Sequence, residues 1–301
     1  MHGKMTMKTV HFYKYQGAGN DFIIVDNRKG TFSDLDYRQI AALCERRFGI
    51  GADGFMMLEK HADYPFCMRF FNSDGLPGSM CGNGGRCICA FAAENGIVPQ
   101  NQPFKFWSSD GEHEGLVVSR HGNHAIVRLK MRKVTQYACD RERDRFLLDT
   151  GSPHYVQFLD DCEGVDVVQK GRDIRFSSDF PQGVNVDFVE QRPDGLQMRT
   201  YERGVEDETY SCGTGATAAA LASVLRNEAA TGHHTVHITT KGGNLQVDFE
   251  METAYTGNKS PKEDSAPLPE GFALFESRMF TQIYLEGLAT FVFEADIPLL
   301  S

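Results

Sequence analysis

The sequence predicts an α+β protein of two related domains, each a β-sheet wrapped around one central helix. Two short runs carry this prediction, Cys81-Gly-Asn-Gly-Gly-Arg86 and Cys212-Gly-Thr-Gly-Ala-Thr217. Each run places a cysteine before Gly-x-Gly and then enters an apolar stretch that is typical of a helix. Strand-like runs surround both stretches, and the strict alternation of strands and helices that a doubly wound sheet needs is missing. A chain of 301 residues has room for two such domains.

The expected strands are short, rich in Val, Ile and Phe, and bounded by Gly, Asp or Asn. They lie at residues 22–26, 55–59, 66–71, 104–107, 116–119, 124–129, 145–148, 155–159, 184–189, 197–201, 235–239, 245–249, 281–285 and 290–293. We see no strand before the Gly17-Ala-Gly19 run, which on its own indicates only a tight turn.

Three helices are expected. Ser33 is a candidate cap for a helix over residues 34–48. Residues 82–95 follow the first cysteine and stop at Gly96, a residue suited to a helix C-terminus, and residues 213–228 follow the second. The apolar face of the first helix consists of Tyr37, Ile40, Ala41, Cys44 and Phe48.

The two cysteine runs also divide the chain. We expect an N-terminal domain over residues 1–130, completed by a C-terminal strand at about 288–301, and a C-terminal domain over residues 131–287. The first carries one cysteine run and the second carries the other. A segment near 253–270, rich in Pro, Ser, Lys, Glu and Gly, reads as an exposed insertion.

The composition indicates an ordinary globular protein and argues against nucleic-acid and membrane binding. Hydrophobic residues make up 41% of the chain and charged residues 24%, as in ordinary globular proteins. The net charge of −10 argues against a surface for nucleic acid or for an anionic membrane. No apolar run approaches the roughly 18 residues that cross a bilayer, and the polar start is unlike a secretory signal. The expected location is the cytoplasm.

Cysteine usage points to thiol chemistry. The eight cysteines contain no Cys-x-x-Cys pair, and no second ligand pair stands at zinc spacing, so no metal site is predicted. Cys87 and Cys89 follow on the expected helix as small core residues. A cysteine at a helix start meets the positive end of the macrodipole, which favours thiolate. Glycines beside it leave N–H groups open to a carboxylate or phosphate.

Two such cysteines suit a reaction that needs an acid and a base on opposite faces of one carbon. Other polar runs are less specific alone, since Glu202 and Arg203 could be a solvated surface pair. On an irregular turn, however, they could hold an ammonium and a carboxylate, the two poles of an amino acid.

Taken together and in order, seven runs resemble the diaminopimelate epimerase family, cofactor-independent enzymes of lysine and cell-wall precursor synthesis. The runs are Gly17-Ala-Gly-Asn-Asp-Phe22, Gly49-Ile-Gly-Ala-Asp-Gly54, Phe71-Asn-Ser-Asp-Gly75, Met80-Cys-Gly-Asn-Gly-Gly-Arg86, Gly151-Ser-Pro-His154, Tyr201-Glu-Arg-Gly204 and Ser211-Cys-Gly-Thr-Gly215. Proline racemases share the two-cysteine plan but typically carry His where this chain has Asn83.

The resemblance implies two pseudo-symmetric domains, each a curled mixed β-sheet around a central α-helix, and epimerisation of LL-diaminopimelate to meso-diaminopimelate. It implies that Cys81 and Cys212 are the catalytic acid and base. The residues that would hold the substrate are Asn20, Asn72, Asn185, Glu202 and Arg203. Those that would hold the carboxylate at the reacting carbon are Gly82, Asn83, Gly213 and Thr214.

Supporting proton transfer is assigned to His154 or Glu202, because a free thiol is only a few per cent thiolate at neutral pH. No cofactor is expected, since no distinctive lysine motif for pyridoxal phosphate is present. The expected partner is a small-molecule amino acid, and a homodimer is a candidate assembly.

The chain departs from the family pattern in three places. Ser152 stands where members often carry Asn, Gly54 where some carry Gln, and the 253–270 segment is longer than usual. Two alternatives therefore stay open. One is another amino-acid racemase on the same scaffold, and the other is a non-catalytic thiol redox sensor.

Overall fold

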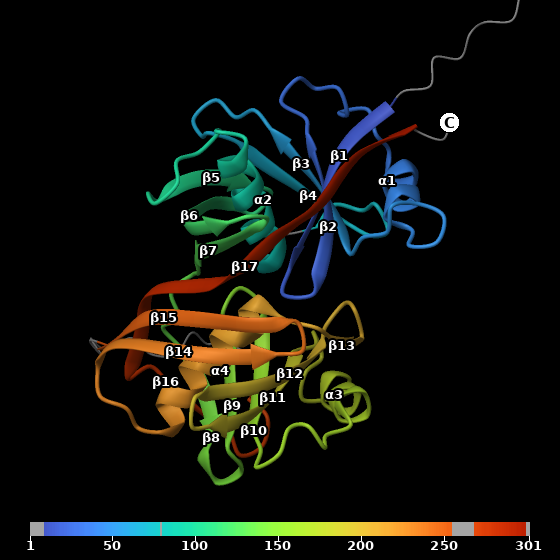
Figure 1. The fold of residues 1–301 in the computed structure, drawn as a ribbon. Coiled ribbons are helices and arrows are strands. Elements are labelled where there is room, and N and C mark those ends of the chain that lie inside the picture. Colours follow the sequence, from blue (N-terminus) through green and yellow to red (C-terminus); the bar gives the residue numbers. More distant parts are fainter. Residues whose placement is uncertain (1–8, 79, 255–267, 299–301) are drawn as a thin grey trace, which may run out of the picture. The chain divides into compact units, whose positions relative to one another are not determined.

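The computed structural model describes residues 9–78, 80–254 and 268–298, which divide into two compact units (Figure 1). The first unit lies within Met1–Leu129 and Gly287–Ser301, and the second within Lys130–Glu286. Most of the expected insertion near 253–270 lies outside the described residues.

Strands of the first unit form a closed ring. Three hairpins, β1–β2, β3–β4 and β5–β6 with β7, are joined by parallel pairing of β2 with β3 and of β4 with β5. The final part of β17 pairs with both β7 and β1 and closes the ring. The strands are β1 Thr9–Gly17, β2 Asn20–Asp26, β3 Gly54–Glu59, β4 Cys67–Asn72, β5 Phe104–Ser108, β6 Gly111–His121, β7 His124–Lys130 and β17 Arg278–Pro298.

The ring encloses helix α2, Gly82–Glu94, which contacts β1, β2, β3 and β6. Side chains alternate along each strand, so Phe22 and Ile24 of β2 join the core around α2. Ile23 and Val25 of the same strand join a second core beneath helix α1, Tyr37–Cys44. Both faces of the sheet are therefore apolar at β2 and β3, which explains why these two strands are continuous hydrophobic runs in the sequence.

The second unit repeats this plan. Its sheet runs β8–β9–β10–β11–β12–β14–β15–β17, with parallel pairing of β10 with β11 and of β12 with β14. Reciprocal backbone hydrogen bonds of 3.0 and 2.7 Å between Val134 and Phe280 link β17 to the segment before β8. The strands are β8 Tyr137–Asp140, β9 Arg145–Asp149, β10 Pro153–Phe158, β11 Asn185–Arg192, β12 Gly195–Glu202, β13 Asp207–Thr209, β14 Gly232–Thr240, β15 Gly243–Thr253 and β16 Ala273–Phe275.

Helix α4, Gly213–Arg226, is the counterpart of α2 and contacts β9 to β12, β14 and β15 (Figure 1). Helix α3, Val167–Arg175, packs against β11, β12 and β13. A short 3-10 helix, Arg141–Arg143, connects β8 and β9. Each unit thus has the order hairpin, helix, hairpin, helix, hairpin, and the predicted α+β class with a central helix in each half is confirmed. No helix in the described ranges has the length and hydropathy of a membrane-spanning segment.

Several expected strand boundaries were wrong. A strand, β1, does precede the Gly17 turn, and β8, β13 and β16 were not predicted. The two strands expected at 281–285 and 290–293 are one strand, β17. Gly287 between them resembles a turn signal, but the backbone ladder continues through it.

The helices that carry the cysteines were predicted closely, whereas the others were not. Cys87 and Cys89 are fully buried, as expected of core residues. Helix α1 is shorter than expected because Asp36, rather than Ser33, caps it by accepting from the N–H groups of Arg38 and Gln39. Tyr37 and Phe48, expected on its apolar face, are exposed, and α3 was not predicted.

Candidate active site

Both motif cysteines occupy the N-cap position of a central helix. Cys81 precedes α2 with an extended backbone (φ −92°, ψ 131°), and Cys212 precedes α4 in the same way (φ −118°, ψ 115°). The carbonyl of Cys81 accepts from the N–H of Gly85 at 2.7 Å, and that of Cys212 from Ala216 at 2.9 Å. The N–H groups of the next residues therefore belong to helix N-termini, which attract anions. The predicted residues Gly82, Asn83, Gly213 and Thr214 are the first two residues of each helix.

In the first unit, the structure brings Asn20 and Asn83 together. Asn83 donates through Nδ2 to Asn20 Oδ1 at 2.5 Å and accepts through Oδ1 from Arg86 Nη2 at 2.7 Å. Asn20 in turn donates to Asp53 Oδ2 at 3.1 Å. Arg86 is fully buried, and this desolvation lowers its pKa. The first turn of α2 is thus tied by side chains to the start of β2.

Asn72 lies at the carboxyl end of β4, opposite Gly54 on β3, and is exposed. Because β2 and β3 are parallel and Phe22 pairs with Gly54, Asn20 and Asn72 lie at the same edge of the sheet. A turn follows Asn72, in which its carbonyl accepts from Gly75 at 2.9 Å.

In the second unit, the Cys212 side chain is buried, with 7% of the residue exposed. Burial is the main reason that the pKa of this thiol is raised well above its ordinary value, and the carboxylates of Glu202 and Asp187 raise it further. The contact with the Thr214 hydroxyl and the hydrogen bond from the Gly215 N–H act in the opposite direction. The helix start, which was expected to supply part of the activation, is outweighed at Cys212 by desolvation.

His154 is buried beside this cysteine. Its Nε2 lies 2.9 Å from Thr214 Oγ1, which itself lies 3.4 Å from Cys212 Sγ. Its Nδ1 lies 2.7 Å from Oδ2 of Asp187, on β11. The contact between His154 and the cysteine is thus indirect and runs through a hydroxyl.

Asn185 and Arg203 form a second polar group around Ser152. Asn185 Nδ2 donates to Ser152 Oγ at 2.8 Å, and Arg203 Nη2 donates to the same oxygen at 3.3 Å. The Arg203 peptide N–H donates to Asn185 Oδ1 at 2.9 Å. Glu202, the last residue of β12, instead accepts from Thr209 Oγ1 at 2.8 Å. Glu202 and Arg203 therefore make hydrogen bonds to different partners.

Asp187 was missed by the sequence analysis. It is fully buried and touches His154, yet no recognised motif includes it. The available signal was its place two residues after Asn185 in an apolar strand, which puts both side chains on one face.

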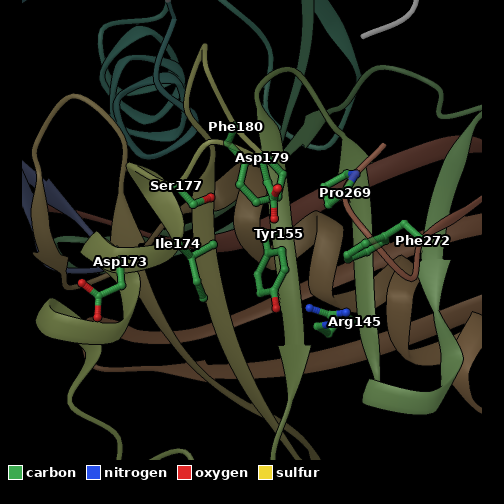
Figure 2. A pocket seen from close by; sticks show the side chains of 9 residues that line it. All are labelled: Arg145, Tyr155, Asp173, Ile174, Ser177, Asp179, Phe180, Pro269 and Phe272. Carbon is green, nitrogen blue, oxygen red and sulfur yellow. The ribbon is translucent and has the colours of Figure 1, made fainter. Parts of the chain in front are cut away.

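A cavity of about 210 Å³ opens elsewhere in the second unit (Figure 2). Tyr155, Phe180 and Phe272 form aromatic walls around it, with Arg145 beside them. None of the predicted site residues lines this cavity. Within the described ranges, no group of three or more His, Cys, Asp or Glu side chains is arranged to hold a metal ion.

Solved structures define the class of fold. A phenazine biosynthesis protein of the PhzF family from Bacillus anthracis matches with a TM-score of 0.70 at 11% identity, over 97% of this chain and 99% of that one. A hydroxyproline epimerase from Agrobacterium vitis matches with a TM-score of 0.65 at 13% identity, over 99% and 94%. At such low identity these matches establish a shared fold.

Sequence comparison then identifies the family. The family model for diaminopimelate epimerase matches residues 12–134 and 146–260. The diaminopimelate epimerase of Flavobacterium psychrophilum is 41% identical over 288 residues, covering 95% of this chain and 99% of that protein. That of Chlorobaculum tepidum is 38% identical over 289 residues, covering 94% and 99%. The chain belongs to the diaminopimelate epimerase family, as its motifs predicted.

Proposed function

We propose that this chain is an isomerase that converts LL-diaminopimelate to meso-diaminopimelate without a cofactor, in the synthesis of lysine and peptidoglycan precursors. The observation that carries the proposal is the position of Cys81 and Cys212. Both cysteines of the family pattern cap the N-terminus of a buried helix, in a chain 41% identical to a diaminopimelate epimerase.

In the proposed reaction, one cysteine as thiolate removes the α-proton of the amino acid. The other, as thiol, delivers a proton to the opposite face of the same carbon. Since the α-proton is weakly acidic, the carbanion-like transition state needs strong stabilisation. N–H groups in the first turns of α2 and α4, at Gly82, Asn83, Gly213 and Thr214, supply positive dipoles for the substrate carboxylate.

Asn20, Asn72, Asn185, Glu202 and Arg203 are the proposed substrate-holding residues. The cluster of Asn185, Arg203 and Ser152 supports a role as one recognition unit, since a guanidinium and an amide suit a carboxylate. His154 and Glu202 are proposed as supporting acid–base groups, because His154 reaches Cys212 through Thr214 and Glu202 acts electrostatically on the same sulfur.

The test is an assay of the purified chain with LL-diaminopimelate in D₂O and no added cofactor. We expect meso-diaminopimelate to form with deuterium at the inverted α-carbon. A parallel panel of proline, glutamate and histidine separates the alternatives. Faster racemisation of any of these would identify another racemase, and no α-hydrogen exchange with any substrate would favour a thiol sensor.

Three further features are proposals that accompany this function. The two compact units are proposed to be the two domains expected near residues 1–130 with 288–301 and near 131–287. A cytoplasmic location and a homodimer are proposed from the biosynthetic role of the family.

A further inference from the structure

A chain of hydrogen bonds, partly buried at Thr214 and fully buried beyond it, connects Cys212 to a carboxylate outside every recognised motif. From the sulfur the contacts run to Thr214 Oγ1 at 3.4 Å, to His154 Nε2 at 2.9 Å and, from Nδ1, to Asp187 Oδ2 at 2.7 Å. The side chains of His154 and Asp187 are both 0% exposed. Water therefore does not compete for the contact between His154 and Asp187, and the electrostatic strength of that contact is high.

Three elements hold Asp187 in this position. It lies on β11, beside His154 of β10, and its second oxygen accepts from Thr200 Oγ1 of β12 at 2.7 Å. A Cβ atom on Gly215 would lie only 2.6 Å from Asp187 Oδ1. The glycine in the first turn of α4 thus leaves the space that the carboxylate occupies.

The carboxylate dictates the protonation of the imidazole. An ionised carboxylate can only accept, so His154 Nδ1 carries a proton and donates it to Asp187. In the neutral imidazole Nε2 is then an acceptor, and the Thr214 hydroxyl donates to it. The Thr214 oxygen remains free to accept from the Cys212 thiol, so every donor in the chain points away from the sulfur.

We propose that Asp187 is a positioning residue that couples Cys212 to His154 through Thr214, so that the buried thiol can ionise. Its part in turnover rests on the proposed epimerase function. In the coupled step the S–H bond of Cys212 breaks and its proton passes to Thr214 Oγ1, while the hydroxyl proton of Thr214 passes to His154 Nε2. The products are a thiolate and an imidazolium, with no change in net charge, and Asp187 stabilises the imidazolium.

If Asp187 acted only through its direct charge on Cys212, removing that charge would shift the pKa of the thiol in the opposite direction. Three titratable groups face Cys212: Glu202 from β12, Asp187 from β11 and His154 from β10, the last through Thr214. As a bare charge, Asp187 raises the pKa of Cys212, so removing the charge would favour thiolate. Acting through His154, Asp187 favours thiolate, so removing the charge would disfavour it.

The experiment measures iodoacetamide alkylation of Cys212 against pH, resolved by peptide mass spectrometry, in the full chain. We expect Asp187→Asn to slow alkylation at pH 7 about tenfold, equivalent to about one pKa unit. Thr214→Val should slow it similarly, and Thr214→Ser, which keeps the hydroxyl, should restore it. In the Thr214→Val chain, Asp187→Asn should instead accelerate alkylation, because only its direct charge effect remains.

Thr200→Val is the control, because it removes the other hydrogen bond to Asp187 and leaves the contact with His154. It should slow alkylation clearly less than Asp187→Asn does, because the carboxylate and its contact with His154 remain. Faster alkylation in the Asp187→Asn single variant would overturn the proposal, as would equal slowing by Thr200→Val. If the Asp187→Asn chain does not fold, the Thr214→Val and Thr214→Ser variants test the coupling instead. Unchanged alkylation of Cys212 in Thr214→Val would then overturn the proposal.

Alkylation needs no amino-acid substrate, so the coupling and the proposed function fail separately. Suppose that Asp187→Asn slows alkylation in the wild-type background and accelerates it in the Thr214→Val background, but the chain does not epimerise diaminopimelate. The proposed coupling would then stand and the proposed function would be rejected. In an active chain, Asp187→Asn should lower kcat by roughly 10²–10⁴-fold with little change in KM, as for loss of general acid–base assistance.

Discussion

Cys81 and Cys212 have the same position on their helices but different electrostatic surroundings. Cys212 is buried near two carboxylates, Glu202 and Asp187, which oppose its ionisation. Cys81 is half-buried, and the buried cation of Arg86 on the same helix interacts with it favourably. Equal motifs therefore do not imply equal electrostatic surroundings, because burial and neighbouring charge add to the common helix dipole.

We predict that Cys81→Ala and Cys212→Ala each lower kcat by at least about 10³-fold, because a two-base reaction needs both thiols. The change removes one sulfur atom and should leave the thermal midpoint close to that of the wild type. Turnover of diaminopimelate and thermal unfolding are measured together. Cys89→Ala and Cys139→Ala, at buried cysteines outside the proposed site, are the matched controls and should retain activity. Near wild-type turnover in either site variant would contradict the two-cysteine mechanism.

A second prediction at this scale concerns Arg203, whose guanidinium contacts Ser152 beside Asn185. Arg203→Met should raise KM for diaminopimelate about tenfold or more, since a desolvated charge-assisted contact contributes roughly 1.5–3 kcal/mol. The loss should be much smaller with an amino acid that has no second carboxylate. Steady-state kinetics with both substrates measure the difference, and Arg192→Met, on the Glu163–Glu190 surface cluster, is the control. An equal loss with both substrates would place Arg203 outside the recognition of the distal group.

At the scale of elements, the cysteine helices were predictable because local signals agree there. Glycine-rich starts, apolar runs and a following glycine point to the same boundaries for α2 and α4. Helix α3 has weaker signals, since Val167 and Gly171 are its only buried residues among the nine that the structure describes. The internal repeat was the better guide, because α3 stands between β10 and β11 as α1 stands between β2 and β3.

The polar network of the site was less predictable than its helices. Asn20 and Asn83 lie far apart in the sequence, and they meet where β1, at Gly17, closely approaches α2. A Cβ atom on Gly17 would lie 3.1 Å from both the Asn83 carbonyl oxygen and Cys87 Sγ. Asp187 escaped notice because strand patterning predicts a buried face but not the partner that makes a buried carboxylate tolerable.

The testable prediction for the elements concerns the tight packing around Gly54 on β3. A Cβ atom there would lie 2.7 Å from Phe70 Cε2 and 3.0 Å from the Phe71 carbonyl oxygen. Gly54→Ala should therefore lower the free energy of unfolding by about 1–3 kcal/mol, as overpacking in a well-filled core does. Denaturant unfolding measures the loss. Combining it with Phe70→Leu should cost less than the sum of the two single changes, because the ring is the nearer obstacle. Strict additivity would show that Phe70 is not the obstacle.

At the scale of the whole chain, the same sequence of elements is built twice. Each unit places a cysteine-capped helix inside a mixed sheet, and a single strand, β17, contributes residues to both units. The sequence reveals the repeat through its two Cys-Gly-x-Gly runs. A C-terminal strand near 288–301 was expected to complete the first domain, but the sequence does not reveal which strands residues 288–298 pair with, β7 and β1, because such pairing is set by long-range contacts.

Acid stability gives the last prediction. Burial opposes ionisation of Asp21, but hydrogen bonds from Arg46 and Lys14 prevail and hold its pKa at about 2. An unfolded aspartate titrates near pH 4, so this carboxylate contributes stability that is fully present above about pH 4 and is lost as pH falls toward about 2. Thermal midpoints of the wild type and Asp21→Asn, measured from pH 6 to pH 2, should therefore differ most above about pH 4 and converge toward about pH 2. Asp194→Asn, in the exposed turn between β11 and β12, controls for the loss of one carboxylate. A gap between wild type and Asp21→Asn that stays constant across this range would show that the charge of Asp21 does not contribute to folding, and that its hydrogen bonds act equally well in neutral form.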